Sequence, residues 1–304
     1  MEMYRPLLSV CIPTYNRLEI LEKTIHSIYQ NIDNVNFHDF EIIVADNEPN
    51  QSSKKIVEKF NYPNLYYYHT TCEGFKNSFE VLKLGTGEFL KLHNNSNLFK
   101  TNTLKELIDE ICENKTNRPL IFHSNGLFKR KGITAFYSFN HFMYSLSYLS
   151  SWSTGFGIWK DDFDKIKNIT LIDPYFPQLS LLLSNENKET YFINNKIIFD
   201  FQVAQKKGGY NIFKVFGVDY LNLIQKAVDT QIDLKTYKKI KTDLLYKFLN
   251  VQYIKTVILK KEFFDYSDLK EHLKIHFKFY EYYLMILSCV FIPFKKIIKN
   301  SFNK

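Results

Sequence analysis

The chain has 304 residues, of which 45% are apolar and 24% are charged, so it is long and apolar enough to fold around a substantial core. Its formal net charge of +8 favours an anionic partner, such as a phosphorylated ligand or an acidic membrane face. Arginine occurs only at positions 5, 17, 118 and 130, without an interleaved basic and aromatic pattern, which argues against nucleic acid as a partner.

Several features indicate a cytosolic protein. No stretch reaches the roughly 18–20 apolar residues of a membrane-spanning helix, and the first residues lack a signal-peptide pattern. The four cysteines are far apart, without a CxxC pair, which predicts reduced thiols. Cys11 and Cys112 fall on apolar faces of expected elements, so we expect both in the core.

The first half of the chain alternates strand and helix patterns. Residues 7–12 are typical of a buried strand, and the polar turn 13–17 leads into a helix with Leu18, Leu21, Ile25 and Ile28 at helical spacing. A second strand covers 40–47. Strands that alternate with helices predict a largely parallel sheet, with the polar strand ends at one edge, where open α/β folds bind ligands.

The alternation continues to about residue 122 and then becomes irregular. We expect helices at about 54–60, 75–84 and 103–111, and strands at 65–68, 88–93 and 119–122. Beyond these lie a helix near 178–184 and a strand around 191–201. Residues 218–260 are typical of helices. The sequence therefore predicts one α/β domain over residues 1–210 and a C-terminal helical region over 211–304.

The turn Pro13-Thr14-Tyr15-Asn16-Arg17 and Asp46, which ends the second strand, resemble the opening of the family 2 glycosyltransferases. The resemblance covers about residues 5–210. It implies the GT-A fold, a Rossmann-like, mostly parallel sheet flanked by helices, and a turn and Asp46 that hold the nucleotide of a sugar donor. Independently, a carboxylate at a strand end can accept from a base or a sugar hydroxyl, and an arginine near a helix start suits a phosphate. The alternative for Asp46 is a helix cap or turn residue.

The segment 87–98 keeps the family's strand but not its acids. Family members have an Asp-rich DxD cluster that binds Mg²⁺ or Mn²⁺, whereas this chain has Asn94, Asn95, Ser96 and Asn97. Hard divalent cations prefer carboxylates, so we assign no metal and no cofactor. We expect Asn94, Asn95 and Ser96 to hydrogen-bond the donor, together with Asn77 from the segment that matches a Gly- and Asn-containing loop of the family.

Without a metal, the leaving diphosphate needs positive charge from elsewhere. Lys206 and Lys207, followed by Gly208-Gly209, stand where family members have a loop that closes over the donor, and we expect them to contact the phosphates. Lys129-Arg130-Lys131 is the competing cluster. For either run, a solvated basic turn is the alternative.

The position of the general base is the second difference from the family pattern. Inverting members use an Asp or Glu near the start of a helix, where this chain has Pro177 and Gln178. An amide cannot accept the proton, so Asp173, just before the helix, is our first choice as the catalytic base. The alternative is a turn residue before Pro174. Further candidates are Asp161, Asp162, His93 and His123.

Two further segments concern the acceptor and the membrane. Trp152 and Thr154 belong to a segment that looks like the acceptor-side loop, where an aromatic face can stack on a sugar.

Residues 277–304 combine an aromatic and apolar block with Lys295, Lys296 and Lys299. This combination predicts contact with an anionic membrane surface. The alternative is a helix packed on the protein's own core.

Together these features predict a glycosyltransferase, peripheral on the inner face of a bacterial cell membrane. It would move a sugar from a nucleotide-sugar donor to a glycan or lipid-linked glycan acceptor in surface polysaccharide synthesis, such as capsule or O-antigen. The pattern looks most similar to the abequosyltransferase-like branch. The alternative is a non-catalytic subunit of the same fold that binds a partner enzyme or a glycan. A nucleotidyltransferase is disfavoured, because no Gly-rich phosphate loop follows the first strand.

Overall fold

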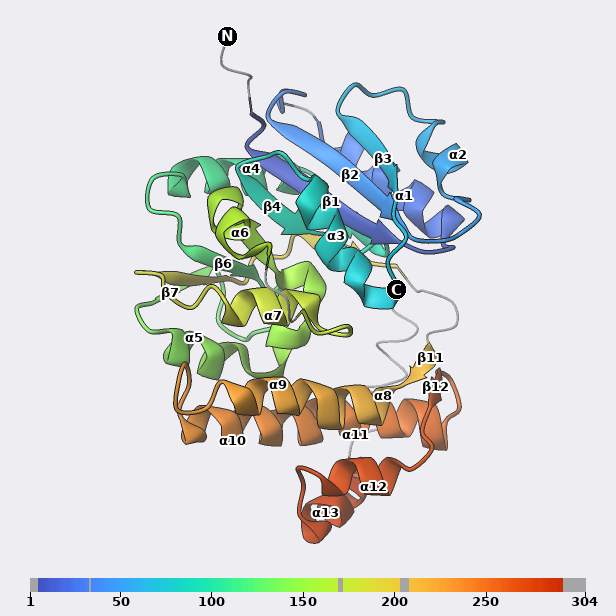
Figure 1. The fold of residues 1–304 in the computed structure, drawn as a ribbon, viewed down its shortest axis with the longest axis vertical. Helices are drawn as coiled ribbons and strands as arrows, with labels where there is room; N and C mark the ends of the chain where they lie inside the picture. Colours follow the sequence, from blue (N-terminus) through green and yellow to red (C-terminus); the bar gives the residue numbers. More distant parts are fainter. Residues whose placement is uncertain (1–4, 33, 169–171, 203–207, 292–304) are drawn as a thin grey trace. The chain divides into compact units, whose positions relative to one another are not determined.

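The computed structural model describes residues 5–32, 34–168, 172–202 and 208–291 (Figure 1). The chain divides into two compact units. The first comprises Met1–Phe142 and Leu149–Gln202, and the second comprises Met143–Tyr148 and Val203–Lys304. The expected boundary between residues 210 and 211 falls inside strand β11 (Gly208–Asn211), which belongs to the second unit.

A five-stranded sheet with the order β3-β2-β1-β4-β8 forms the centre of the first unit. Its first four strands in this order run parallel, and β8 is antiparallel. In the register, Cys11 lies opposite Ile43 on one side and Leu92 on the other, so β1, β2 and β4 end at the same edge. The strands are β1 (Leu8–Thr14), β2 (Phe40–Asp46), β3 (Leu65–His69), β4 (Phe89–Leu92) and β8 (Gly157–Trp159).

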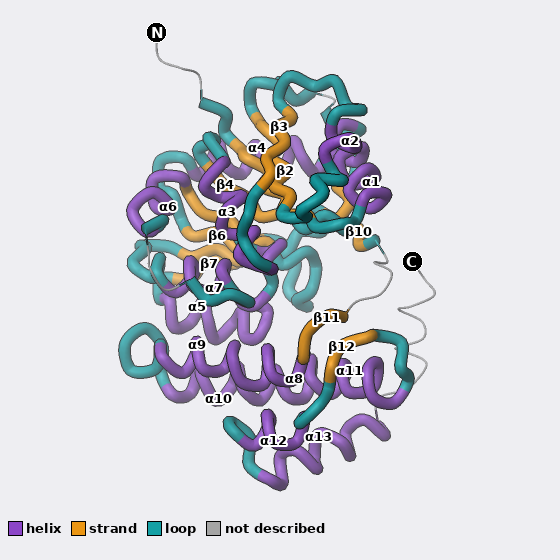
Figure 2. The backbone as a smooth tube through the Cα atoms, turned by 45° about the vertical axis from the view of Figure 1, so that its right-hand side comes forward, coloured by secondary structure: helices purple, strands orange, loops and turns teal. Residues whose placement is uncertain are grey.

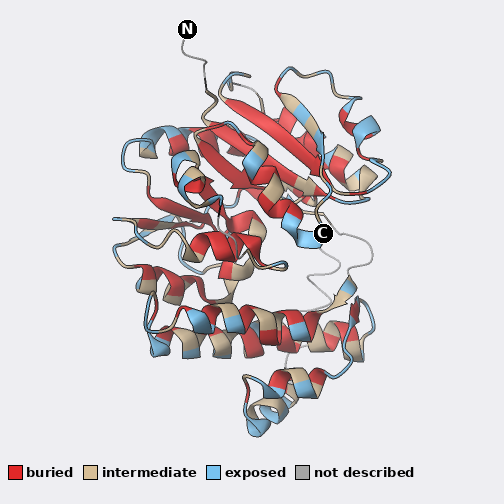
Figure 3. Cartoon of the chain, viewed as in Figure 1, coloured by how far each residue is buried: buried red, intermediate tan, exposed pale blue. Residues whose placement is uncertain are grey.

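Helices cover this sheet and bury its apolar strands, which are red in Figure 3. In the first helix, Leu21, Ile25 and Ile28 are fully buried, as their spacing predicts. The prediction of an α/β fold with a mostly parallel sheet is confirmed. The helices are α1 (Leu18–Tyr29), α2 (Lys54–Val57), α3 (Asn77–Leu84), α4 (Thr103–Asn114), α6 (Lys160–Ile166) and α7 (Pro177–Leu183), with a 3-10 turn at Gly74–Lys76 before α3.

Smaller sheets complete the first unit. β9 (Tyr191–Asn194) lies between β6 (Leu120–His123) and β7 (Ile133–Phe136). β5 (Asn97–Phe99) pairs with β10 (Phe199–Phe201), so the strand expected over 191–201 is two strands. Helix α5 covers Phe139–Leu146, and the division between the two units falls within it, after Phe142.

The two cysteines expected in the core differ. Cys11 on β1 is buried as expected, but Cys112 on α4 is exposed. In α4 the buried apolar residues are Leu104, Leu107, Ile108 and Ile111. Residue 112 lies about 100° around the helix from residue 111, which carries it out of this stripe. The expectation of a core Cys112 was therefore wrong.

The second unit is mainly helical, with a short parallel strand pair (Figure 2). π-helical turns join α8 to α9 and α10 to α11. Within the described part of the chain, no helix is long and apolar enough to cross a membrane. The elements are α8 (Ile212–Lys214), α9 (Leu221–Lys226), α10 (Leu234–Asp243), α11 (Asn250–Tyr253), α12 (Leu269–Lys274), α13 (Phe279–Phe291), and β11 with β12 (Phe263–Asp265).

Candidate active site

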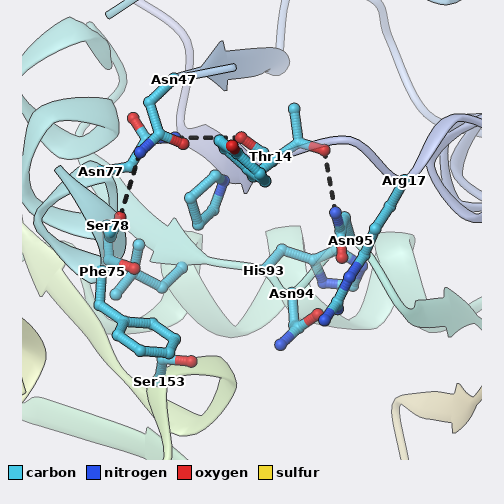
Figure 4. A pocket seen from close by; sticks show the side chains of 14 residues that line it. Thr14, Arg17, Asn47, Phe75, Asn77, Ser78, His93, Asn94, Asn95 and Ser153 are labelled. Carbon is cyan, nitrogen blue, oxygen red and sulfur yellow. Dashed lines mark hydrogen bonds between the residues drawn. The ribbon is translucent and has the colours of Figure 1, made fainter. Parts of the chain in front are cut away.

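A pocket of about 490 Å³ lies at the carboxyl edge of the central sheet in the first unit (Figure 4). This is the edge at which the sequence predicts a ligand site. The ends of β1, β2 and β4, the start of α3 and the turn before β8 all contribute to it. Its lining residues are Pro13, Thr14, Tyr15, Arg17, Asn47, Gly74, Phe75, Asn77, Ser78, Leu92, His93, Asn94, Asn95 and Ser153.

The turn after β1 forms one wall of the pocket. Asn16 adopts a left-handed backbone conformation with φ of 47°, which asparagine tolerates better than most residues and which turns the chain sharply into α1. Arg17 is the N-cap residue of α1 and is half-buried. Among the described residues, the Arg17 guanidinium has no ion-pair or hydrogen-bond partner, and Arg17 is the one charged side chain of the pocket lining.

The end of β2 places Asn47, not Asp46, in the lining. Asp46 is fully buried, and its carboxylate accepts from the backbone N–H of Glu48 at 3.0 Å and of Ser53 at 3.2 Å, and from the Tyr67 hydroxyl at 3.4 Å. These bonds fix the loop that follows β2. The predicted contact of Asp46 with a nucleotide stays a prediction.

Asn77 connects β2 to the pocket at the start of α3. Its Nδ2 donates to the Ala45 carbonyl at 2.8 Å and to Asn47 Oδ1 at 3.3 Å. Its Oδ1 accepts from the Thr70 hydroxyl at 2.8 Å. Asn77 is therefore 2% exposed and acts mainly by orienting Asn47, although it also lines the pocket as predicted.

The end of β4 carries the amides that replace the acid cluster. Asn94 Oδ1 accepts from the backbone N–H of Ser96 at 3.0 Å and from its hydroxyl at 2.9 Å. Asn95 Nδ2 donates to Thr14 Oγ1 at 2.9 Å, and so ties this segment to the β1 turn. Asn97 Nδ2 donates to Thr154 Oγ1 at 3.1 Å. Ser96 does not line the pocket, whereas Asn94 and Asn95 do.

This set of side chains does not fit a divalent cation. The pocket lining contains no carboxylate, and the Asn94 side-chain oxygen already accepts two hydrogen bonds. Neutral amides and hydroxyls leave the charge of Mg²⁺ or Mn²⁺ unbalanced. The described residues contain no group of three His, Cys, Asp or Glu side chains that could hold a metal ion.

Lys91 fastens the turn before β8 to the end of β4. It is fully buried, and its Nζ donates to the carbonyl oxygens of Leu92 at 3.1 Å, Phe156 at 3.3 Å and Thr154. Burial lowers the pKa of Lys91 to about 7. Because Ser153 lies in the same turn, Lys91 also holds one side of the pocket in place.

The two histidine candidates are built into the core. His93 Nε2–H donates to the Asn97 carbonyl at 2.8 Å, and its ring lies 4.9 Å from the Phe99 ring. Burial lowers the pKa of His93 to about 3, so the ring is neutral at physiological pH. His123 hydrogen-bonds Glu110 at 2.9 Å, and burial lowers its pKa despite this partner. The geometry gives both histidines structural roles.

The predicted acids do not line the pocket. Asp173 Oδ1 accepts from the backbone N–H groups of Tyr175 and Phe176, both at 2.9 Å, in the turn before α7. Asp161 pairs with Arg118, which lowers its pKa, and Asp162 pairs with Lys188. Asp173 as the catalytic base therefore stays a prediction.

The remaining predicted residues fall in different places. Thr154 is fully buried and bonded to Asn97, while Trp152 is half-buried with its ring 6.0 Å from that of Phe201. Lys206 and Lys207 lie outside the described residues. Residues 129–131 are exposed and do not line the pocket.

Sequence reasoning did not select several residues of the lining. Asn47 directly follows Asp46 at the same strand end, and Ser153 lies between the two predicted acceptor residues, so each had a nearby signal. Gly74 and Phe75 belong to the segment that matches the family's Gly- and Asn-containing loop, and Leu92 belongs to the segment 87–98. Ser78 had no such signal, since its place in the lining depends on how α3 packs over the sheet edge.

Comparisons with known proteins agree with this architecture. The family model described as glycosyl transferase family 2 matches residues 9–166. A Campylobacter jejuni protein, GalNAc(5)-diNAcBac-PP-undecaprenol beta-1,3-glucosyltransferase, is 29% identical over 113 residues, which are 36% of this chain and 35% of that protein. The chain thus matches about a third of the length of this relative.

Solved structures show the same fold at low sequence identity. Staphylococcus aureus TarS 1–349 in complex with UDP-GlcNAc has a TM-score of 0.56 and 16% identity, covering 92% of this chain and 79% of that one. The mannosyltransferase PcManGT from Pyrobaculum calidifontis, in complex with GDP-Man and Mn²⁺, has a TM-score of 0.52 and 13% identity, covering 97% and 82%. The predicted GT-A fold is therefore confirmed, and the chain belongs to glycosyl transferase family 2.

Proposed function

We propose that this protein transfers a sugar from a nucleotide-sugar donor, which binds in the pocket at the carboxyl edge of the central sheet. The observation that carries the proposal is the pocket itself, formed by the strand ends of a family 2 domain and lined by amides and one unpaired arginine. Amides recognise the hydroxyls and the base of a nucleotide sugar, and a guanidinium recognises its phosphates.

In the proposed reaction, an acceptor hydroxyl attacks the anomeric carbon of the donor sugar. The new carbon–oxygen bond forms as the bond to the diphosphate breaks, and the nucleoside diphosphate leaves with the bonding electron pair. The proton of the hydroxyl passes to a general base, for which Asp173 remains our candidate. Since the side chains at the end of β4 do not suit a divalent cation, we propose that transfer needs no bound metal.

For the acceptor we propose a lipid-linked glycan of a bacterial surface polysaccharide. Support comes from the name of the Campylobacter relative, which acts on a glycan linked to undecaprenol through a diphosphate. Capsule or O-antigen synthesis and the affiliation with the abequosyltransferase-like branch belong to the same proposal.

Such an acceptor would be met at a membrane, and we propose that the protein is peripheral on the inner face of the cell membrane. The second unit offers a surface for this contact, which we call the α13 stripe. The exposed side chains of the stripe are Ile275, Phe279, Tyr280, Tyr283, Leu284 and Leu287.

The α13 stripe has the chemistry of an interfacial surface. Met285 and Cys289, on the other side of α13, are buried, so the helix is held by one face and exposes the other. Lys270 Nζ lies 3.2 Å from the Tyr283 hydroxyl and 5.5 Å from the centre of the Phe279 ring. Cations beside exposed aromatic rings suit anionic headgroups. The predicted Lys295, Lys296 and Lys299 lie outside the described residues.

Liposome co-sedimentation tests the α13 stripe. We expect the double variant Leu284→Glu, Leu287→Glu to lose most binding to vesicles that contain phosphatidylglycerol. The control is Leu127→Glu, which changes a leucine of similar exposure in the first unit. This variant should bind vesicles as wild type does. Equal binding by all three proteins would place the membrane contact elsewhere.

A donor screen tests the transferase proposal. Thermal shift with UDP-, GDP-, CDP- and dTDP-sugars should identify at least one stabilising donor, and that donor should release its nucleoside diphosphate when a glycan acceptor is added. Donor binding without release, over a range of acceptors, would favour the non-catalytic subunit. No binding by any donor would contradict the transferase proposal and leave a subunit that binds a partner enzyme or a glycan.

A further inference from the structure

We infer that Arg17 and Asn94 together form a fixed anion site for the diphosphate of the donor, which takes the place of a bound metal ion. This inference rests on the proposed function, because it concerns the same pocket. The sequence alone suggested that Arg17 suits a phosphate and that Lys206 and Lys207 contact the diphosphate; the inference adds the Asn94 amide and assigns the pair the place of the metal.

The first step concerns charge. Of the described residues that line the pocket, Arg17 is the one that is charged, since His93 is neutral at physiological pH. Other cations of this unit have carboxylate partners, such as Arg118 with Asp161 and Lys115 with Glu88 at 2.6 Å. A half-buried guanidinium without a carboxylate partner is available to a ligand, and its planar donors match two phosphate oxygens.

The second step concerns the orientation of the Asn94 amide. Its Oδ1 accepts from the backbone N–H of Ser96, which can only donate, so the oxygen and nitrogen of this amide are fixed in place. The group left for a ligand in the pocket is therefore the Nδ2 amino group. An N–H donor suits a phosphate oxygen and cannot coordinate a cation.

The third step concerns how the two residues are held together. Asn95, which follows Asn94 in the chain, donates to the Thr14 hydroxyl at 2.9 Å and so links the end of β4 to the β1 turn that carries Arg17. In Figure 4 the Arg17 side chain extends from this turn toward the Asn94 and Asn95 side of the pocket. The structure therefore places a cation and a neutral donor at one end of the pocket, where the family resemblance implies acids and a metal.

Calorimetry with UDP, GDP, CDP and dTDP, and with the matching nucleosides, tests the inference in the presence of EDTA. Taking the diphosphate that wild type binds best, we expect Arg17→Gln to weaken it about 10-fold to 100-fold while nucleoside binding stays unchanged. Asn94→Asp should also weaken the diphosphate about 10-fold, because a carboxylate repels phosphate and pairs with Arg17. Lys23→Gln, on the exposed face of the same helix, is the matched control for net charge and should bind as wild type does.

The outcomes separate this inference from the proposed function. If wild type binds a diphosphate and Arg17→Gln leaves its affinity unchanged, or weakens nucleoside and diphosphate equally, the anion site is wrong and the transferase proposal stands. Unchanged affinity in Asn94→Asp would likewise overturn the role of Asn94. If wild type binds none of the four diphosphates, the proposed function fails and this inference fails with it. Unfolding curves of each variant check that the first unit remains folded.

Discussion

Two walls of the pocket, one formed by the turn after β1 and the other by the end of β4, differ in their charge. The turn after β1 keeps the residues of the family pattern and presents Arg17 without a partner among the described residues. The end of β4 has lost the acids of that pattern, and Asn94, Asn95 and Asn97 hydrogen-bond neutral groups. These two features act in the same direction, because a wall without carboxylates leaves the arginine of the other wall free for an anion.

Whether this pocket suits a metal ion or an anion therefore depends on both walls together. A carboxylate at position 94 would attract a metal cation and would also neutralise the charge of the Arg17 guanidinium. With an amide there, neither occurs. We propose that the charge needed by a leaving diphosphate is carried by the β1 wall of this pocket, and the following experiments test this proposal.

The largest expected effect is that of Asp46→Ala. Asp46 lies opposite Thr14 in the sheet register, and its removal leaves the backbone N–H groups of Glu48 and Ser53 without their acceptor. Because hydrogen bonds to a charged group are worth about 1.5–3 kcal/mol each, we expect the free energy of unfolding to fall by roughly 3 kcal/mol, measured by urea denaturation. We also expect nucleotide affinity, measured by calorimetry, to fall by about 1–3 kcal/mol. Unchanged affinity would remove Asp46 from the binding site.

A smaller effect is expected from acid, through His93 at the end of β4. Its pKa is about 3 in the folded protein and 6.5 in a model compound, so the unfolded chain binds more protons between these values. Stability is therefore lost as pH falls below 6.5. Between pH 6.5 and 5, His93 should contribute a loss of about 1.5 kcal/mol.

Urea unfolding at pH 6.5 and pH 5 measures the His93 contribution. We expect the loss between the two pH values to be smaller in His93→Gln than in wild type. His123 also has a lowered pKa and contributes equally to both proteins, so the difference between them isolates His93. The same loss in both proteins would mean that His93 is accessible to protons, and that the wall at the end of β4 is less closed than described.

The smallest effect is expected from Thr14→Val, which removes the hydrogen bond between the two walls. The change keeps the shape of the side chain but removes the acceptor of the Asn95 amide at 2.9 Å. We expect a loss of about 1 kcal/mol in the free energy of unfolding. Diphosphate affinity should fall several-fold, because Asn94 is then held less firmly relative to Arg17. An unchanged affinity would show that the two walls act independently.

The sequence predicts the part of the site that depends on strand ends. The turn 13–17 and the strand ends near 47 and 94 all lie at one edge of a parallel sheet, so Arg17, Asn94 and Asn95 come together as expected. Asp46 is the last residue of the fully buried strand β2 and Asn47 is the first residue after it, so Asp46 is buried beside the sheet and Asn47 lines the pocket.

Contacts between distant parts of the chain are not visible in the sequence. Lys91 interrupts an apolar strand, and its carbonyl partners at Thr154 and Phe156 lie 63 and 65 residues away. Hydrogen bonds of this kind depend on tertiary packing and have no local pattern. Asp173 differs, because its carboxylate accepts from backbone N–H groups two and three residues further on, which is the local turn that the sequence offered as the alternative to a catalytic base.

The metal dependence of diphosphate binding is the decisive test of whether Arg17 takes the place of a metal ion. Calorimetric titrations of wild type with the nucleoside diphosphate that it binds best should be run once in excess EDTA and once in excess MnCl₂. Because Arg17 supplies fixed charge and the end of β4 has no carboxylate, we predict affinities within about threefold of each other, well under the tenfold that corresponds to 1.4 kcal/mol. Binding that disappears in EDTA and returns with Mn²⁺ would contradict the account.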